Sequence, residues 1–206
     1  MVEDMKQQIV IIHGGTTFDS QGDYLSYLKN KEIDLEKLRP HLDWRYSLQN
    51  ELGENFEVLL PQMPDKTNAH YNEWKIWFER ILPLLDKEII LVGHSLGGIF
   101  LAKYLSENNF PKKIKATILV AAPFDDKDSG KSLADFKLSF PLDRFVKQGG
   151  KIYLIQSKGD PEVLFGNLEK YKKALPNAET IVFEDRGHFS QESFPEIIEL
   201  IKTLNE

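Results

Sequence analysis

Six short apolar runs, rich in β-branched residues and separated by stretches with helical spacing, constrain the fold of this chain most. They cover residues 8–12, 56–60, 88–92, 116–121, 151–155 and 180–183. Strands that are apolar at every position, rather than at every second one, are covered on both faces, as in parallel sheets. Helical patterns lie between the runs, for example at residues 74–85, 96–107 and 192–204. The alternation predicts an α/β fold with six strands, helices on both faces of the sheet and right-handed crossovers.

Length, charge and cysteine content narrow the class of protein. The 206 residues suit one domain, residues 1–206, and contain no repeat or linker. The formal net charge of -6 argues against a nucleic-acid binder and against a polybasic membrane anchor. The chain has no cysteine, which excludes disulfides, thiolate metal sites and a cysteine nucleophile. The first apolar run is too short for a signal peptide or a membrane span, so we expect a cytoplasmic protein. Nothing in the sequence sets the oligomeric state.

Two long connections depart from the minimal pattern and are candidates for lids or insertions. Residues 19–53 are predicted to hold extra helical pieces, at 24–29 and 35–38, before a regular helix at 44–52. Residues 123–140 begin with the acids Asp125, Asp126 and Asp128 and continue with mixed apolar and polar residues. The acidic cluster itself is interpreted as a solvated loop.

The sequence GHSLGG at residues 93–98 directly follows a predicted strand and opens a predicted helix. This is the G-x-S-x-G pattern in the context that gives it meaning. A strand-to-helix turn this tight lifts the hydroxyl of Ser95 above the carboxyl ends of the strands. Gly93 and Gly97 lack side chains that would collide across the turn. We therefore predict Ser95 as a nucleophile, and the N–H of Leu96 as a donor to a developing oxyanion.

A serine hydroxyl needs a base, and in enzymes with this elbow the base follows the acid along the chain. His188 is the one histidine after Ser95, just past the last predicted strand, and Gly187 lets the loop turn sharply. The acid is predicted to be Asp160, which follows the fifth strand between Gly159 and Pro161. Its carboxylate would orient the imidazole of the base.

Other acids remain open as partners of the base. Asp125 and Asp126 follow the fourth predicted strand, a position that some hydrolases use. Glu162 is two residues from Asp160.

The loop after the first strand, residues 13–17, is predicted to supply the second oxyanion donor, because its glycines expose backbone N–H groups. Gly15 is favoured, with Thr16 next, and His13 is expected to pin the loop through a side-chain hydrogen bond. The loop lacks the lysine and the glycine spacing of nucleotide-binding loops. No pair of histidines has the spacing H-E-x-x-H, so we predict no metal, and the chemistry requires no cofactor.

Aromatic residues near the strand ends are candidates for an apolar substrate pocket, although such residues more often close a core. Phe124 and Phe189 are predicted to line the pocket together with Thr16 and His94, and Phe136 and Phe140 are further candidates.

The expected reaction is hydrolysis of an ester, thioester or amide through an acyl-enzyme. A carboxylesterase acting on a small or medium acyl substrate is the leading form. A binding or scaffold protein that keeps the fold but little activity, or an acyltransferase, are the alternatives.

Taken together, these motifs resemble those of the α/β-hydrolase superfamily over nearly the whole chain. The matching pieces are His13-Gly14-Gly15, Gly93 to Gly98, Gly159-Asp160-Pro161 and Gly187-His188. More narrowly, the chain looks like the small serine hydrolases typified by retinoblastoma-binding protein 9. The cues are the short length, the immediate start at a central strand, and Pro61-Gln62-Met63-Pro64 followed by Trp74 and Trp77. The resemblance implies a trimmed, all-parallel sheet with the strand order 2-1-3-4-5-6.

Overall fold

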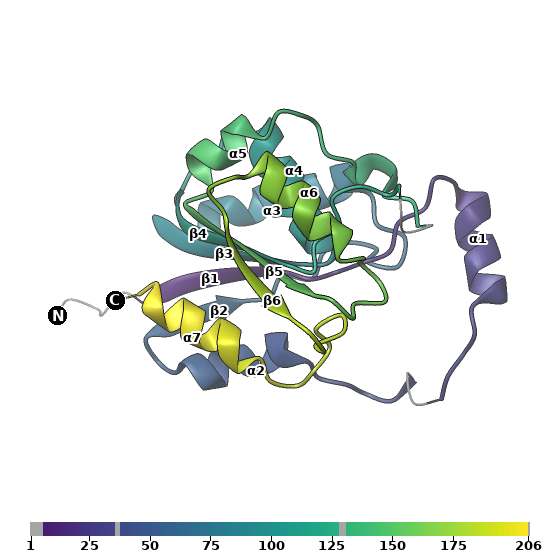
Figure 1. Cartoon of the computed structure of the whole chain (residues 1–206), viewed down its shortest axis with the longest axis horizontal. Helices are drawn as coiled ribbons and strands as arrows, with labels where there is room; N and C mark the ends of the chain where they lie inside the picture. Colours follow the sequence, from purple (N-terminus) through teal and green to yellow (C-terminus); the bar gives the residue numbers. More distant parts are fainter. Residues whose placement is uncertain (1–5, 36–37, 128–130, 206) are drawn as a thin grey trace.

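The computed structural model describes residues 6–35, 38–127 and 131–205, which form a six-stranded parallel sheet between two layers of helices (Figure 1). The strands are β1 (Gln7–Ile12), β2 (Phe56–Leu59), β3 (Glu88–His94), β4 (Lys113–Val120), β5 (Lys151–Ser157) and β6 (Glu179–Phe183). Their order is β2-β1-β3-β4-β5-β6, and every neighbouring pair is parallel. The α/β fold and the strand order expected from the sequence are confirmed.

The central strands carry continuous apolar runs because each of their faces meets a layer of helices. In β1, Val10 and Ile12 belong to the core on one face of the sheet, and Ile9 and Ile11 belong to the core on the other. All four side chains are fully buried. This two-sided burial is why a continuous run, rather than an alternating one, marks these strands in the sequence.

The helices fall into two groups around the sheet. They are α1 (Gln21–Asn30), α2 (Trp44–Leu52), α3 (Tyr71–Ile81), α4 (Leu96–Glu107), α5 (Asp143–Gln148), α6 (Gly166–Ala174) and α7 (Pro195–Thr203), with short 3-10 turns η2 (Leu82–Leu84) and η3 (Ala134–Phe136). Helices α2 and α7 cover one face, and α3 to α6 cover the other (Figure 1). Of these, α5 and α6 were not foreseen as separate helices.

The segment 19–53 forms a projecting arm followed by a packed helix. Helix α1 stands off the body of the molecule, and none of its residues is buried (Figure 1). Its start is fixed by Ser20, whose Oγ accepts a hydrogen bond from the Asp23 N–H at 3.1 Å. The expected helical piece at 24–29 lies inside α1, and the expected helix at 44–52 is α2. The candidate piece at 35–38 includes two residues outside the described part of the chain.

The segment 123–140 contains η3 and contributes to the core. Phe136 is fully buried and packs edge-to-face against Trp74 and Tyr71, so it closes the core rather than lining a pocket. Phe140, in contrast, is exposed. Asp128 lies outside the described residues.

Candidate active site

Ser95 occupies a strained turn between β3 and α4. Its backbone lies at φ 55° and ψ -123°, a positive φ that non-glycine residues rarely adopt. The turn is held by the Ser95 N–H, which donates to the carbonyl of Val120 at 2.9 Å. A Cβ on Gly93 would lie 2.6 Å from the carbonyl oxygen of Gly97, as the predicted elbow requires.

Gly97 is required by a further contact that the sequence did not foresee. A Cβ on Gly97 would lie 2.2 Å from the carbonyl oxygen of Ile12 at the end of β1. The elbow therefore packs closely against β1, which fixes Ser95 relative to the loop that follows β1.

His188 lies on the loop after β6, with its ring turned toward Asp160. The Nδ1 atom of His188 is 2.9 Å from Oδ2 and 3.1 Å from Oδ1 of Asp160. The residues on either side of His188, Gly187 and Phe189, both have positive φ, at 52° and 54°. A carboxylate only accepts hydrogen bonds, so Nδ1 donates, and in the neutral ring the free lone pair is on Nε2. This is the tautomer in which an imidazole acts as a base through Nε2.

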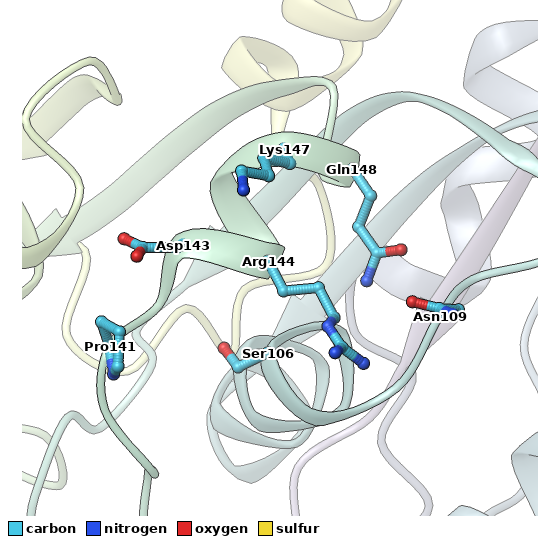
Figure 2. Close-up of a pocket in the computed structure, with 7 residues that line it drawn as sticks. All are labelled: Ser106, Asn109, Pro141, Asp143, Arg144, Lys147 and Gln148. Atoms are coloured by element: carbon cyan, nitrogen blue, oxygen red, sulfur yellow. The ribbon is translucent and has the colours of Figure 1, made fainter.

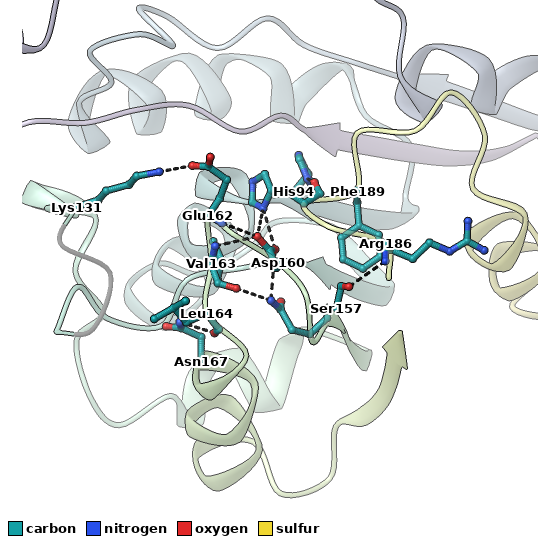
Figure 3. A network of polar contacts seen from close by, with 12 residues as sticks. His94, Lys131, Ser157, Asp160, Glu162, Val163, Leu164, Asn167, Arg186 and Phe189 are labelled. Carbon is teal, nitrogen blue, oxygen red and sulfur yellow. Dashed lines mark hydrogen bonds and ion pairs between the residues drawn. The ribbon is translucent and has the colours of Figure 1, made fainter. Parts of the chain in front are cut away.

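The carboxylate of Asp160 is fully buried and held by several donors (Figure 3). Its Oδ1 accepts from the backbone N–H groups of Glu162, at 2.8 Å, and Val163, at 3.0 Å. The Nε2 group of Gln156 lies 3.4 Å from Oδ2. These donors fix the position of the carboxylate next to the ring of His188.

The other acids that the sequence left open have other partners. Asp125 forms an ion pair with Lys170 at 2.7 Å, and Asp126 forms one with Lys137 at 2.9 Å. Glu162 pairs with Lys131. Hydrogen bonds from the paired lysines contribute to lowering the pKa of all three carboxyls against the opposing effect of desolvation. Of these candidate acids, the structure brings only Asp160 to His188.

A cavity of about 1090 Å³ opens in front of Ser95, and both Ser95 and His188 line it. Its walls come from the loop after β1, from α1, from the segment 131–133 and from the loops after β5 and β6. Within the described residues, no hydrogen bond joins the Ser95 hydroxyl to His188. Catalytic hydrogen bonds are often long before substrate binds and shorten in the complex.

The loop after β1 passes directly beside Ser95. A Cβ on Gly14 would lie 3.0 Å from the Ser95 Cβ and 3.5 Å from its Oγ. The N–H of Thr16 already donates to the carbonyl of Lys66 at 2.8 Å, so it is not available to a substrate oxygen. Of the two amides considered for this loop, Gly15 therefore remains. Leu96, whose N–H is the other candidate donor, is the first residue of α4.

His13 pins this loop, as expected. Its Nε2 accepts from the N–H of Met63 at 2.9 Å, and its Nδ1 donates to the carbonyl of Gly14 at 2.7 Å. Burial lowers the pKa of His13, which keeps the ring neutral and able to accept through Nε2.

The predicted pocket residues divide into two pairs. Thr16 and His94 line the cavity, whereas Phe124 and Phe189 do not. The pocket role expected for Phe189 is not supported, because its ring is only 1% exposed and packs in the core against Phe183 and Phe194. Phe124 packs against Tyr171 and Phe140 instead.

The aromatic residues Phe18, directly before the arm, and Tyr27, on α1, line the cavity. Their rings lie 5.1 Å apart, centre to centre. The lid-like segment 19–53 was the sequence signal for Tyr27, but it did not indicate which face of the helix points inward, and Phe18 lies just outside it. The charged residues Arg45 and Lys66 also line the cavity without having been foreseen.

A second, smaller cavity of about 490 Å³ lies between α4 and α5 and shares no residue with the first (Figure 2). Its polar groups bind the end of α4. Gln148 Nε2 donates to the carbonyls of Leu105 and Asn108, at 2.7 and 2.8 Å, and Arg144 donates to that of Glu107 at 2.9 Å. These contacts satisfy free carbonyls at a helix C-terminus, which is a structural task.

The residues that the structure describes lack two further features, a membrane-spanning helix and a metal-binding cluster. Among these residues, no helix is both long enough and apolar enough to cross a membrane. No three side chains of histidine, aspartate or glutamate gather there in a group suited to a metal ion.

Comparisons with known proteins agree with this architecture. The serine hydrolase RBBP9 of Rattus norvegicus is 28% identical to the chain over 151 residues, which cover 72% of this chain and 78% of that protein. The solved structure of the ydeN gene product from B. subtilis has a TM-score of 0.77 at 19% identity, and the match covers 97% of this chain and 99% of that one. The esterase domain of a Rhodothermus marinus protein has a TM-score of 0.63 at 15% identity, covering 98% of this chain and 88% of that one. Both structures share the α/β-hydrolase fold with this chain.

The family comparison covers most of the sequence. The family described as serine hydrolase matches residues 38–204, which include β2 to β6 and the residues Ser95, Asp160 and His188. The chain belongs to the serine hydrolase family.

Proposed function

We propose that Ser95, His188 and Asp160 form a catalytic triad, and that the protein is a carboxylesterase acting on small or medium acyl substrates. The observation that carries the proposal is the hydrogen bond between His188 Nδ1 and the buried carboxylate of Asp160, with Ser95 and His188 on the wall of one cavity. A base oriented through one nitrogen and open at the other is what a serine nucleophile needs.

The reaction begins with attack of the Ser95 Oγ on the carbonyl carbon of the substrate. The hydroxyl proton passes to Nε2 of His188, and the carbonyl oxygen becomes an oxyanion. The N–H groups of Leu96 and Gly15 donate to that oxyanion. His188 then gives its proton to the leaving oxygen, and an acyl-enzyme forms on Ser95. Water repeats the sequence, with His188 as its base, and releases the acid.

Asp160 contributes by holding the base rather than by exchanging protons. Its two backbone donors fix the carboxylate, and the carboxylate fixes the proton on Nδ1. It also stabilises the imidazolium that forms when His188 takes up the proton from Ser95. Every step uses these side chains and water, so the proposal includes no cofactor.

The lining of the cavity supports an acyl substrate of small or medium size. Leu96, Leu133 and Val163 supply aliphatic surface, and Phe18 and Tyr27 supply aromatic surface. A cavity of about 1090 Å³ accommodates a ligand of drug-like size. The likeness in fold to an esterase domain also favours an ester as the substrate. Thioesters and amides follow the same chemistry.

Hydrolysis of p-nitrophenyl butyrate tests the proposal. We expect the wild-type protein to release p-nitrophenol with a burst equal to the active sites, because an activated ester acylates Ser95 faster than water removes the acyl group. The Ser95→Ala variant should show no burst and at least a 10³-fold lower turnover, on the order of the loss known for triad nucleophiles. Equal turnover by both proteins would remove Ser95 from the mechanism.

Two further outcomes separate the alternatives. A folded wild-type protein that neither hydrolyses the ester nor reacts with a fluorophosphonate probe would favour a binding or scaffold role. Butyryl transfer to an added alcohol in preference to water would identify an acyltransferase.

A further inference from the structure

The loop that carries His188 is held by its own backbone carbonyls. Five consecutive carbonyl oxygens, from residue 188 to residue 192, each accept a hydrogen bond from another part of the chain. The donors are His94 Nε2 to His188 at 2.9 Å, Trp44 Nε1 to Phe189 at 3.0 Å, His41 Nε2 to Ser190 at 2.9 Å, the Trp44 backbone N–H to Gln191 at 2.9 Å, and Ser47 Oγ to Glu192 at 2.9 Å. One donor comes from the elbow, and the others come from residues 41–47.

Of these five contacts, the one from His94 is made to His188 itself. Its ring is only 6% exposed and lies edge-to-face against Trp44, with the centres 6.2 Å apart. The ring of His188 is 4.9 Å away. A carbonyl oxygen cannot donate, so Nε2 of His94 carries the proton, and Nδ1 is left as an acceptor.

That acceptor has no partner. Nδ1 of His94 is buried and receives no hydrogen bond from the described residues. Leaving a buried acceptor unpaired destabilises the folded state. A phenylalanine would fill the same space against Trp44 without this cost. Packing therefore does not explain a histidine at position 94, whereas the hydrogen bond from its Nε2 does.

We propose that His94 is a positioning residue for His188, acting through the carbonyl of the catalytic histidine, with Trp44 supporting the same loop. This inference rests on the proposed function, in which His188 is the base. His188 is thereby held at two points, with Asp160 binding its ring and His94 binding its backbone.

The backbone conformation of this loop explains why His188 needs a second point of attachment besides its ring. Gly187 and Phe189 both have positive φ, so the chain turns sharply on each side of His188. The carbonyl of His188 belongs to the peptide unit that leads into Phe189. Fixing that unit limits rotation of the backbone and therefore the direction of the imidazole.

The chemistry of His94 suits a place beside a base that becomes charged. Burial, together with the nearby His188, lowers the pKa of His94 to about 3. The ring stays neutral when His188 takes up a proton from Ser95. A cationic neighbour at the same distance would oppose that step.

The test compares four variants with the wild type, using p-nitrophenyl butyrate and the burst to count active sites. His94→Phe removes the donor and keeps the ring, and His94→Gln restores a donor at about the position of Nε2. Thr117→Val is the matched control. Thr117 lies in β4, and the substitution removes its buried hydrogen bond to the carbonyl of Gly149, 2.7 Å long. Ser95→Ala gives the background rate.

For His94→Phe we expect kcat to fall on the order of 10²-fold with KM nearly unchanged, which is the loss that a small misplacement of a catalytic group produces. Its melting temperature should equal or exceed that of the wild type. His94→Gln should recover most of kcat. Thr117→Val should lower the melting temperature and leave kcat per active site unchanged. The downfield proton resonance of the His188 Nδ1–H should weaken or shift in His94→Phe alone.

Wild-type kcat and an unchanged His188 resonance in His94→Phe would overturn the inference. The inference would also be overturned if His94→Phe lost activity only because it unfolds and if His94→Gln did not restore that activity. If the wild type is no faster than Ser95→Ala, the proposed function fails instead, and the His188 resonance still decides whether His94 positions that ring.

Discussion

Asp160 differs from the other acids near the cavity in what surrounds its carboxylate. Asp125 and Asp126 face lysines at the surface, and such pairs contribute little and tolerate change. Asp160 is instead fully buried and binds backbone N–H groups and His188. A buried carboxylate is tolerable only when all its neighbours are donors, so its position is strictly determined.

Replacing Asp160 by Asn should therefore disable the base while leaving the fold in place. An amide can donate to Nδ1 of His188, which favours the tautomer with the proton on Nε2, where the serine proton must go. We expect kcat for p-nitrophenyl butyrate to fall on the order of 10³- to 10⁴-fold. Asp126→Asn is the matched control and should retain wild-type kcat. A smaller loss in Asp160→Asn than in Asp126→Asn would show that the wrong acid has been identified.

The buried ring of His94 should make the stability of the protein depend on pH. Its pKa is lowered from 6.5 to about 3, chiefly by burial, with His188 and Arg45 lowering it further and Asp43 opposing them. Below pH 6.5 the unfolded chain therefore binds a proton that the folded protein refuses. The contribution of the neutral His94 ring to the free energy of unfolding is fully present above pH 6.5. It is lost as the pH falls toward 3, by up to about 1.4 kcal/mol per pH unit.

Urea unfolding of the wild type and of His94→Phe between pH 7 and pH 4.5 measures this loss. The free energy of unfolding should fall less steeply with decreasing pH in His94→Phe, because the remaining groups titrate in both proteins. Parallel pH profiles would mean that His94 takes up its proton over the same pH range in the folded and unfolded states.

At the scale of elements, the turn from β3 to α4 was the feature most open to prediction. This geometry depends on local steric constraints, which come from consecutive residues: a strand, a serine between two glycines, and a helix. The contact of Gly97 with β1 was missed, because it depends on a strand that lies some 80 residues away in the sequence.

The arm formed by α1 is the element most suited to setting substrate preference. Tyr27 faces the cavity, whereas Leu28, one residue on, lies outside its lining and is 49% exposed. Tyr27→Ala should raise KM for p-nitrophenyl butyrate by roughly three- to tenfold through lost apolar contact, with kcat little changed.

Leu28→Ala is the matched control on the same helix and should leave KM as it is. Both variants should fold like the wild type, because no residue of α1 is buried. A rise in KM for Leu28→Ala but not for Tyr27→Ala would place the substrate elsewhere.

What the sequence could not predict lies mostly in long-range packing. The apolar runs predicted all six strands, and the central ones are covered on both faces, but α6 is short and largely polar and has no such pattern. Phe189 was expected in the pocket because it lies near the end of a predicted strand. Its positive φ turns the ring into the core, beside Phe183 and Phe194. Side-chain direction in a loop depends on backbone angles that the residue types leave open.

At the scale of the whole molecule, the parallel sheet explains how distant residues meet. Ser95 follows β3, Asp160 follows β5 and His188 follows β6, and parallel strands end at the same edge. The ligand sites of such folds lie at this edge. The segment 41–47 and the loop after β1 close the site from the other end of the chain. In the sheet only β4 lies between β3 and β5, and β6 is the neighbour of β5, so the ends of these three strands lie close together.

In the proposed mechanism the Ser95 hydroxyl is an activated nucleophile. Intact-protein mass spectrometry after treatment with a fluorophosphonate probe, followed by peptide mapping, tests this activation. We expect one adduct per chain, located on Ser95, no adduct in Ser95→Ala, and much slower labelling in a His188→Ala variant. A wild-type protein that remains unlabelled, or one labelled equally fast without His188, would contradict it.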